Sequence, residues 1–477
     1  MTTLLKAMQT NDSRTENGMA TNSTSLNACV DLFFQVGAMR GQDKGRLINA
    51  FTKAFAENPL TAMRLLFWAR DVRGGAGERQ IGKDIMSYLA NRHTDAMRKN
   101  IHLVTEFGRW DDLLVFFGTP LEKDALELIA KGLNDKNGLC AKWMPRPNVK
   151  NREAKRQSHT IRKFMGLDPK TFRTLLVENS NTVEQLMCAK NFGAIEYSKL
   201  PSKAMSDYMK AFSKNDKERF AAYLASLEKG EVKINAGALF PYDVTKNLRF
   251  GNAQGADAQW KALPNFMEGN TEKVLPLVDV SSSMDQKVGD NPNLNVLEVA
   301  ISLGLYVCER NIGPFQDAFI TFDSHPELIT VKGLLSERYR QMKSSPWGGS
   351  TNLASAFNLI LDKAVKGGVP QEEMPTAMII FSDMEFDRSD RSWNETAQQM
   401  IEAKFAAAGY KMPKIIYWNL ASRGDKNKPV HFDKKGTALV SGFSPSILKS
   451  VLSGKSVTPY DMMMEVIDSE RYSVVTV

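Results

Sequence analysis

A short turn rich in carboxylate and hydroxyl groups follows an apolar segment near the middle of the chain. Asp279, Ser281 and Ser283 alternate with Val280 and Ser282 directly after the apolar residues 274–278. The apolar run is typical of a strand that is buried on both faces. The alternation lets three side-chain oxygens converge beyond the strand end. Since Mg²⁺ binds about six oxygens and usually keeps several waters, this turn indicates part of a cation site.

Two later segments supply further oxygens. The loop Pro346–Leu353 contains Gly348-Gly349, then Thr351, and leads into an expected helix over 352–364. A second apolar strand, expected over 377–382, ends at Asp383. Ligands of open α/β sheets bind outside the carboxyl ends of the strands, where all these segments can meet. The predicted ligands of a divalent cation, with Mg²⁺ favoured, are Asp279, Ser281, Ser283, Thr351 and Asp383.

The order Asp-x-Ser-x-Ser, then Thr351 after Gly-Gly, then Asp383 resembles the metal-ion-dependent adhesion site of von Willebrand factor A-type domains. The resemblance implies that Ser281, Ser283 and Thr351 contact the metal directly or nearly so, with Asp279 and Asp383 partly through water. An open coordination position would then accept an oxygen from a partner, such as an acidic side chain. The alternative is that Asp279 and the serines cap the next segment, but capping predicts neither Thr351 nor Asp383.

The sequence offers few components for catalysis. None of its five histidines lies in an HExxH or comparable ligand spacing, and no GxSxG motif surrounds a serine. Metal-assisted hydrolysis by Asp279 and Asp383 remains conceivable. A metal held mainly by neutral hydroxyls, however, keeps more positive charge, which suits capture of an anionic ligand. We therefore expect a binding protein, not an enzyme.

Length and charge indicate two folded parts. A chain of 477 residues exceeds the size at which one core stops growing. Residues 1–273 contain 41 Lys and Arg against 30 Asp and Glu, whereas residues 274–477 contain 21 against 24. The basic excess therefore lies in the first part and suggests a polyanionic partner for it, although basic surfaces also serve solubility.

The expected organisation is multidomain, an all-α part followed by a doubly wound α/β part. Residues 1–25 are rich in Thr, Asn and Ser and are expected to be a disordered tail. Residues 26–249 have helical periodicity and suggest a bundle or a HEAT-like solenoid of helix pairs, although no repeat of residue identity is visible. Residues 250–273 form an expected linker, and 274–477 alternate between expected strands and helices.

A basic segment within the helical part is the stronger candidate for nucleic-acid contact. Residues 142–163 carry eight Lys or Arg and one acid, Glu153. Nucleic-acid surfaces combine cations for phosphates with aromatic rings for stacking, whereas a solvated helix face usually mixes both signs. The candidate RNA-binding residues are Lys142, Trp143, Arg146, Lys150, Arg152, Lys155, Arg156, His159, Arg162 and Lys163.

A Gly-rich turn between two expected helices is a weaker candidate. Residues 70–79 read Arg-Asp-Val-Arg-Gly-Gly-Ala-Gly-Glu-Arg. Backbone N–H groups with Arg70, Arg73 and Arg79 could bind a phosphate at the helix start. Alternatively, the turn is structural and its arginines pair with Asp71 and Glu78. No Gly-Lys-Ser/Thr follows, so the turn is not a nucleotide-binding P-loop.

These segments extend the resemblance over nearly the whole chain from about residue 26. Residues 70–79, 107–113, 142–146, 200–202 and 241–243 look like an uncharacterised Ro/TROVE-like family, related to the Ro ribonucleoprotein autoantigen. In the relatives, a ring of HEAT-like helix pairs binds small noncoding or misfolded RNA, and an A-type domain closes the ring. The resemblance implies a non-catalytic RNA-binding ribonucleoprotein component. The alternative is a metal-dependent protein interaction module on a helical scaffold without RNA.

The cellular setting is expected to be the cytoplasm. No run of 18 apolar residues occurs, and the start of the chain is polar. Cys29, Cys140, Cys188 and Cys308 are scattered without CxxC spacing. This pattern favours reduced thiols over a disulfide framework or a zinc site.

Overall fold

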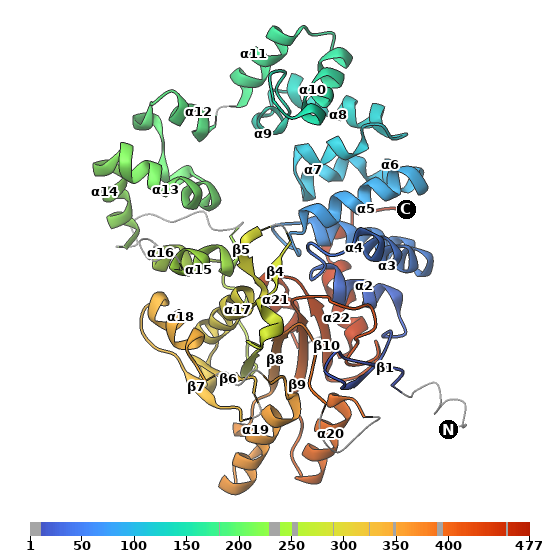
Figure 1. The fold of residues 1–477 in the computed structure, drawn as a ribbon, viewed down its shortest axis with the longest axis vertical. Coiled ribbons are helices and arrows are strands. Elements are labelled where there is room, and N and C mark those ends of the chain that lie inside the picture. The colour runs from blue at the N-terminus through green and yellow to red at the C-terminus, as the bar shows by residue number, and fades with distance from the viewer. Residues whose placement is uncertain are drawn as a thin grey trace. The chain divides into compact units, whose positions relative to one another are not determined.

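The chain divides into a mostly helical unit and an α/β unit. A computed structural model describes residues 11–180, 182–228, 239–249, 256–289, 291–323, 325–346, 350–388, 395–454 and 457–477. One compact unit contains residues 1–65 and 239–469, and the other contains 66–238 and 470–477 (Figure 1). An all-helical region followed by a domain with parallel strands agrees with the coarse fold class expected from the sequence.

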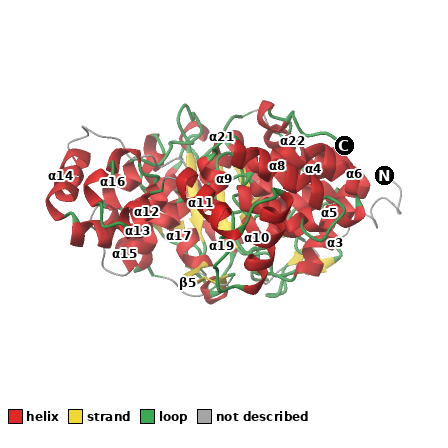
Figure 2. Ribbon diagram, turned by 90° about the horizontal axis from the view of Figure 1, so that it is seen from above, coloured by secondary structure: helices red, strands yellow, loops and turns green. Residues whose placement is uncertain are grey.

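The described residues of the unit 66–238 form only helices and loops, as Figure 2 shows for α8 to α14. Asparagine side chains begin two of them: Asn137 caps α9 and Asn151 caps α10, each by accepting a backbone N–H three residues on. The α-helices are α4 (Pro59–Arg70, which contains the unit boundary), α5 (Arg79–Arg92), α6 (Thr94–Asn100), α7 (Val104–Phe107), α8 (Glu122–Asn134), α9 (Gly138–Trp143), α10 (Arg152–Phe164), α11 (Pro169–Ser180), α12 (Val183–Cys188), α13 (Ser202–Asn215) and α14 (Lys217–Glu228). Short 3₁₀ helices span Ile101–Leu103, Trp110–Phe116, Phe192–Ala194 and Tyr197–Lys199.

The last residues of the chain pack into this helical unit. Phe107 lies between Phe67 and Tyr472, with ring centroids 5.3 and 5.5 Å apart. The side-chain amide of Asn100 forms two hydrogen bonds with the backbone of Thr476. Its Nδ2 donates to the Thr476 carbonyl, and its Oδ1 accepts from the Thr476 N–H. The 3₁₀ helix Glu470–Tyr472 therefore belongs to the helical unit. The predicted domain 274–477 is thus wrong for residues 470–477.

A six-stranded sheet forms the centre of the α/β unit. Its order is β10-β9-β8-β3-β6-β7, with β7 antiparallel to β6 and all other neighbours parallel. The strands are β3 (Val274–Val278), β6 (Ala318–Thr321), β7 (Leu328–Thr330), β8 (Ala377–Ser382), β9 (Lys414–Asn419) and β10 (Thr437–Ser441). Every residue of β3, β8 and β10 is buried, as expected for strands covered on both faces. Because Val278 pairs with Phe381, β3 and β8 end at the same level.

Helices cover this sheet, and α17 lies closest to its centre. Gly304 permits the close approach, since a Cβ there would come within 2.6 Å of the Val278 side chain on β3. The α-helices of the unit are α2 (Ala28–Val36), α3 (Lys44–Glu57), α15 (Pro241–Arg249), α16 (Ala256–Lys261), α17 (Val296–Arg310), α18 (Leu335–Lys343), α19 (Leu353–Gly367), α20 (Ala397–Ala407), α21 (Leu448–Val451) and α22 (Pro459–Ile467). Its 3₁₀ helices are Ser282–Asp285, Gly313–Phe315, Gln371–Glu373 and Pro445–Ile447, and its small strand pairs are β1 (Ser13–Arg14) with β2 (Ala20–Thr21) and β4 (Lys287–Val288) with β5 (Asn291–Asn295).

The first helix of the expected helical domain joins the sheet instead. The α2 carbonyls of Phe33 and Phe34 accept hydrogen bonds from Ser441 and Asn419, which end β10 and β9. Residues 26–65 therefore fall in the α/β unit, not in a helical domain of 26–249. The expected linker 250–273 also contains α16, whose Trp260 is buried. Apolar periodicity indicated the helices within residues 26–65 but not the unit they pack in, and α16 was not predicted.

The expected tail of residues 1–25 is corrected by the structure from residue 11 onward. Residues 1–10 lie outside the described part of the chain. Met19 and Ala20 are buried, and the Asn22 N–H and carbonyl both pair with Lys428 at 3.1 and 2.9 Å. The polar composition misled the prediction because this segment is held mainly by backbone and side-chain hydrogen bonds, not by an apolar stripe.

Candidate metal centre and basic surface

The two predicted carboxylates lie where the strand order reverses. From β3 the chain proceeds to β6 on one side and later to β8 on the other, so the switch point lies between β3 and β8. Asp279 follows β3 and Asp383 follows β8, and the Asp279 N–H donates to Phe381 O across the sheet. Ligands of doubly wound sheets bind at this position because the diverging connections leave a crevice.

The Asp279 carboxylate is fully buried and has hydrogen-bond donors on both oxygens. Ser382 Oγ donates to Oδ2 over 2.6 Å, and the Ser281 N–H donates to Oδ1 over 2.9 Å. Burial, followed by the charge of Asp383, raises the pKa of Asp279 to about 7. The protein therefore holds this acid at an energetic cost if it is ionised without a nearby cation.

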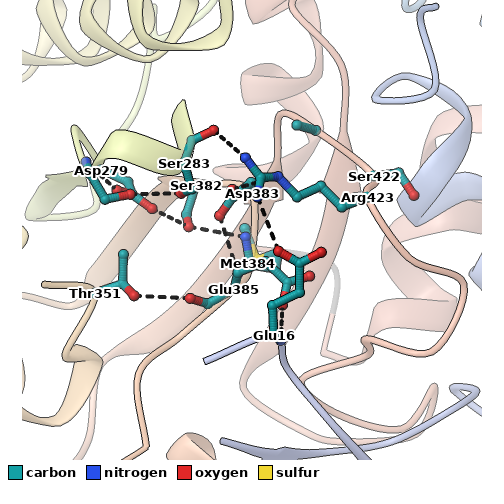
Figure 3. Close-up of polar contacts among 12 residues, drawn as sticks. Glu16, Asp279, Ser283, Thr351, Ser382, Asp383, Met384, Glu385, Ser422 and Arg423 are labelled. Atoms are coloured by element: carbon teal, nitrogen blue, oxygen red, sulfur yellow. Dashed lines mark hydrogen bonds and ion pairs between the residues drawn. The ribbon is translucent and has the colours of Figure 1, made fainter. Parts of the chain in front are cut away.

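Asp383 is also buried, and one of its oxygens lacks a hydrogen bond. The Glu385 N–H donates to Oδ1 over 3.2 Å, whereas Oδ2 accepts no hydrogen bond within the described part of the chain. Arg423 Nε lies 3.4 Å from Oδ2 (Figure 3). Burial raises the pKa of Asp383, and the Ser283 hydroxyl and Arg423 offset only part of that effect. A buried carboxylate oxygen without a donor fits an oxygen ligand for a cation.

The predicted hydroxyls are divided between this pair and a neighbouring network. Ser281 Oγ and Ser283 Oγ lie 2.8 Å apart beside Asp279. Thr351 Oγ1 lies 2.9 Å from both the Glu385 carbonyl and Asp387 Oδ1, on the far side of the Asp383 turn. Thr351 thus contacts the turn that follows Asp383, and its hydroxyl donates to acceptors other than the two predicted carboxylates. Gly348-Gly349, predicted to shape this loop, lies outside the described residues.

The donor set fits a hard cation. It comprises two carboxylates and three hydroxyls, all oxygen, which Mg²⁺ prefers to nitrogen or sulfur. The structure brings Asp279, Ser281, Ser283 and Asp383 together and keeps Thr351 next to them. Across the described residues, no group of three or more His, Cys, Asp or Glu side chains is arranged to hold a metal. A site here would therefore depend on its hydroxyls as much as on its acids.

Three residues at this site were not predicted from the sequence. Arg423, from the loop after β9, contacts Asp383, donates to Ser283 O and pairs with Glu16 at 3.0 Å. Asn17 Nδ2 donates to Thr351 Oγ1 and to Glu385 O. Figure 3 shows Glu16 and Arg423 beside Asp383. No sequence signal identifies them, because residues 16 and 17 lie more than 250 positions before Asp279.

The basic segment of the helical unit forms α9, a turn and α10. Within it Lys150, Arg152, Lys155, Arg156, His159 and Lys163 are exposed, whereas Lys142, Trp143, Arg146 and Arg162 are half-buried. Lys142 pairs with Glu184 at 3.2 Å, and Arg156 pairs with Glu153 at 2.8 Å. Arg162 Nη2 lies 2.7 Å from His159 Nδ1. Most predicted cations therefore reach solvent on one helix and the turn before it.

Trp143 does not present two free faces for stacking. The Arg109 guanidinium lies 3.4 Å from the centre of its ring system, and Lys142 Nζ lies 5.5 Å away. Arg109 itself is fixed by Asp111, at 2.7 and 2.8 Å. A base could reach only the part of the ring that Arg109 leaves uncovered. Arg109 thus joins the candidate surface, a residue that the predicted set did not include.

The arginines of the Gly-rich turn are divided between the interior and the surface. Arg70 is buried and pairs with Asp112 at 2.6 Å. Arg79 pairs with Asp111, and Arg73 is exposed. The alternative of a structural turn therefore describes Arg70 and Arg79, although their partners are Asp111 and Asp112 and not the predicted Asp71 and Glu78. Asp71 instead accepts hydrogen bonds from Arg471 and Tyr472.

The cysteine thiols offer little further reactivity. All four cysteines are free, and Cys29, Cys140 and Cys308 are buried. Burial raises the pKa of Cys29 and of Cys140 to about 12, so neither thiol ionises readily. None of the described helices combines the length and the apolar character that crossing a bilayer requires.

Comparison with known proteins identifies the family. Residues 15–163 and 146–272 match a domain of unknown function, DUF2828, and residues 273–474 match a second one, DUF7788. The chain is also similar to uncharacterized protein L728 of Acanthamoeba polyphaga mimivirus, with 30% identity over 510 residues that cover 96% of this chain and 87% of that protein. The chain therefore belongs to the family of proteins that join a DUF2828 domain to a DUF7788 domain.

Proposed function

We propose that the α/β unit is an A-type domain that binds a divalent cation, with Mg²⁺ favoured, and uses it to capture an acidic group of a partner. The observation that carries the proposal is the pair of buried carboxylates at the switch point, of which Asp383 Oδ2 lacks a hydrogen-bond donor among the described residues. Asp279, Ser281, Ser283, Thr351 and Asp383 would hold the ion. Three of these five ligands are hydroxyls, which add no negative charge, so the ion would keep positive character for an anionic ligand.

The cation would supply a point of positive charge for an anionic ligand. The chain's own groups do the rest: Ser382 and the Ser281 N–H orient Asp279, and the Glu385 N–H orients Asp383. Ser281 and Ser283 hydrogen-bond each other. In the proposed role the site binds and orients an anionic ligand and is not catalytic.

A direct binding experiment tests this function. Mn²⁺, a paramagnetic substitute for Mg²⁺, is titrated into the full chain and the free ion is measured by electron paramagnetic resonance. We expect one site that Mg²⁺ displaces and that Asp279→Ala abolishes. Asp362→Asn, an exposed acid on α19 in the same unit, is the matched control and should bind normally. Equal Mn²⁺ binding by wild type and Asp279→Ala would exclude the assignment.

Partner capture requires a second measurement. Proteins retained by the immobilised full chain are compared in the presence of Mg²⁺ and of EDTA, with Asp279→Ala alongside. The proposal predicts a set of partners that both EDTA and the substitution remove. Identical sets under all three conditions would rule out a metal-dependent interaction.

A second candidate function, RNA binding by the helical unit, rests on α10 and the turn before it. The exposed cations Lys150, Arg152, Lys155, Arg156 and Lys163 accompany a single acid, Glu153. The resemblance to Ro/TROVE proteins, with their HEAT-like helices, favours small noncoding or misfolded RNA as the ligand. In the helical unit α10 packs against α8 and α11 (Figure 1).

Charge reversal tests the RNA assignment. Arg152, Lys155, Arg156 and Lys163 are changed together to Glu, and binding of a structured RNA is measured over a range of salt concentrations. Each lost phosphate contact should reduce the log–log salt slope by roughly 0.7, or about 3 for all four. The matched control reverses Lys190, Lys210, Lys214 and Lys217, which are exposed elsewhere in the same unit. The same slope for both quadruple variants would exclude α10 as the interface.

A further inference from the structure

An N-terminal strap, residues 13–22, lies against the turn that follows Asp383; it is a hairpin in which β1 pairs with β2 and residues 15–18 form the turn. Thr15 Oγ1 donates to Phe386 O over 2.7 Å, and Gly18 forms a β-bridge with Asp387. Buried Met19 and Ala20 fix the middle of the strap, while Glu16 and Asn17 remain exposed. The strap is therefore anchored at Thr15 and again from Gly18 onward, and its turn presents the side chains of Glu16 and Asn17 to the site.

Asn17 contacts the same hydroxyl that the cation would need. Its Nδ2 lies 3.2 Å from Thr351 Oγ1 and 2.7 Å from the Glu385 carbonyl. The Glu16 N–H donates to Glu385 Oε2 over 2.5 Å. Together these bonds hold the strap against the turn that follows Asp383, on the side where Thr351 lies.

Arg423 connects the strap to the carboxylate pair. Its guanidinium lies 3.4 Å from Asp383 Oδ2 and 3.0 Å from Glu16 Oε2, and it donates to Ser283 O. The guanidinium thus provides positive charge to the oxygen that lacks a hydrogen bond. A divalent cation on Asp383 would repel Arg423 at this separation. Loss of Arg423 from the site would remove the ion partner of Glu16.

We propose that the strap is a built-in competitor of the partner and that Arg423 couples its release to the cation. Without the ion, Arg423 bridges Asp383 and Glu16, and Asn17 covers Thr351. Cation binding displaces Arg423, releases the turn of residues 15–18 and exposes the metal face. The partner that replaces this turn is a protein loop with a carboxylate, because it takes the place of Glu16 and Asn17, which lie in the turn of the hairpin. This inference rests on the proposed metal function.

Two measurements on the full chain test the coupling. Removing the competing charge by Arg423→Gln should tighten Mn²⁺ binding roughly tenfold. Arg340→Gln, an exposed arginine on α18, is the matched control and should leave the affinity unchanged. In wild type, Mn²⁺ should increase hydrogen exchange at residues 15–18, whereas in Glu16→Gln the exchange should already be high without the ion.

The results separate the coupling from the metal function itself. Tighter Mn²⁺ binding by Arg423→Gln, with faster exchange of the strap in wild type, supports the coupling. Mn²⁺ binding that Asp279→Ala abolishes but Arg423→Gln leaves unchanged or weakens overturns the coupling alone. Absence of Mn²⁺ binding in every variant overturns the proposed function as well. If Arg423→Gln proves unfolded by circular dichroism, exchange in Glu16→Gln decides the outcome, and protection equal to wild type refutes the coupling.

Discussion

Each unit buries a group of aspartates, but the two groups are neutralised differently. In the helical unit, Asp112 pairs with buried Arg70 and Asp71 pairs with Arg471. In the α/β unit, Asp279 and Asp383 lie together with Arg423 near only one oxygen, at 3.4 Å. A buried charge is stable only when it is paired and hydrogen-bonded. Among the described residues, one oxygen in each group, Asp112 Oδ1 and Asp383 Oδ2, accepts no hydrogen bond, but the helical group has several cations around its acids, whereas the sheet group has Arg423 alone for two acids.

The ionisation of the acids follows the same contrast. Burial raises the pKa of Asp111, but the hydrogen bond from Arg109 and the charges of Lys83, Arg109 and Arg79 outweigh it, so the net pKa is lowered. For Asp279, burial and the neighbouring Asp383 both raise the pKa, to about 7. The pKa values of Asp111 and Asp279 thus shift in opposite directions because the charges around the two carboxylates differ. Two buried acids side by side with raised pKa values are common at functional sites, and the contrast therefore supports the proposed metal site.

The largest expected effect comes from breaking the helical group. Asp112→Ala leaves Arg70 buried without its ion partner and should lower the free energy of unfolding by about 3–5 kcal/mol. Urea denaturation of the full chain, followed by the helical circular dichroism signal, measures it. The double variant Asp112→Ala, Arg70→Met should recover most of the loss. A single-variant loss below about 1 kcal/mol would contradict the assigned role of the pair.

The sheet group should respond to an added cation. At a Mg²⁺ concentration of 100 times Kd, we expect the wild type to be stabilised by about 2.7 kcal/mol, because only the folded site binds the ion. Thermal unfolding with and without Mg²⁺ provides the comparison. The stabilisation by Mg²⁺ should vanish in Asp279→Ala and persist in Asp111→Ala. This holds whatever the stability of each variant without the metal. An increment that survives in Asp279→Ala would place the ion elsewhere.

A partly redundant pair should have an intermediate effect. Arg471→Ala removes one partner of Asp71, but the Tyr472 hydroxyl still donates to Asp71 over 3.0 Å. We expect a loss of about 1.5–3 kcal/mol, typical of a hydrogen bond to a charged group. Urea denaturation should show the loss, and Arg471→Lys should restore part of it. An effect as large as that of Asp112→Ala would mean that Tyr472 does not compensate.

An exposed ion pair sets the lower limit of the series. Lys123 and Glu127 on α8 lie 3.7 Å apart with largely exposed side chains. Glu127→Gln should change the free energy of unfolding by no more than about 0.5 kcal/mol, since water screens the attraction. Urea denaturation measures this change. A clearly larger change would show that an ion pair stabilises this protein without burial, so that burial would not explain the difference between the aspartates of the two units.

Local pattern predicted the parts of the candidate site that lie next to regular elements. The apolar runs 274–278 and 377–382 both form strands, and each is followed by the predicted aspartate. Helical periodicity likewise predicted helices from residue 26 onward, and α3 (Lys44–Glu57) is one of them. These predictions depend on residues within one or two turns of each other, where spacing alone defines which side chains share a face.

Long-range partners could not be predicted in this way. Arg471 pairs with Asp71 across 400 positions, and Asn17 contacts Thr351 across 334. Residues 11–25 have a polar composition typical of disorder, yet they pack because complementary hydrogen-bond partners come from the loops after β8 and β9. The composition of a segment indicates how much apolar surface it can bury by itself. It does not indicate which hydrogen-bond partners a distant segment provides.

By itself, the sequence determined which oxygens follow the central strands and which helix carries the excess of positive charge. Both are properties of neighbouring residues. Only the tertiary structure decided that β3 and β8 are adjacent, that Arg70 faces Asp112 in the interior, and that Glu16 and Arg423 meet Asp383. The reason is physical: whether a buried charge is compensated depends on the groups within a few ångströms of it, and folding brings these from distant parts of the chain.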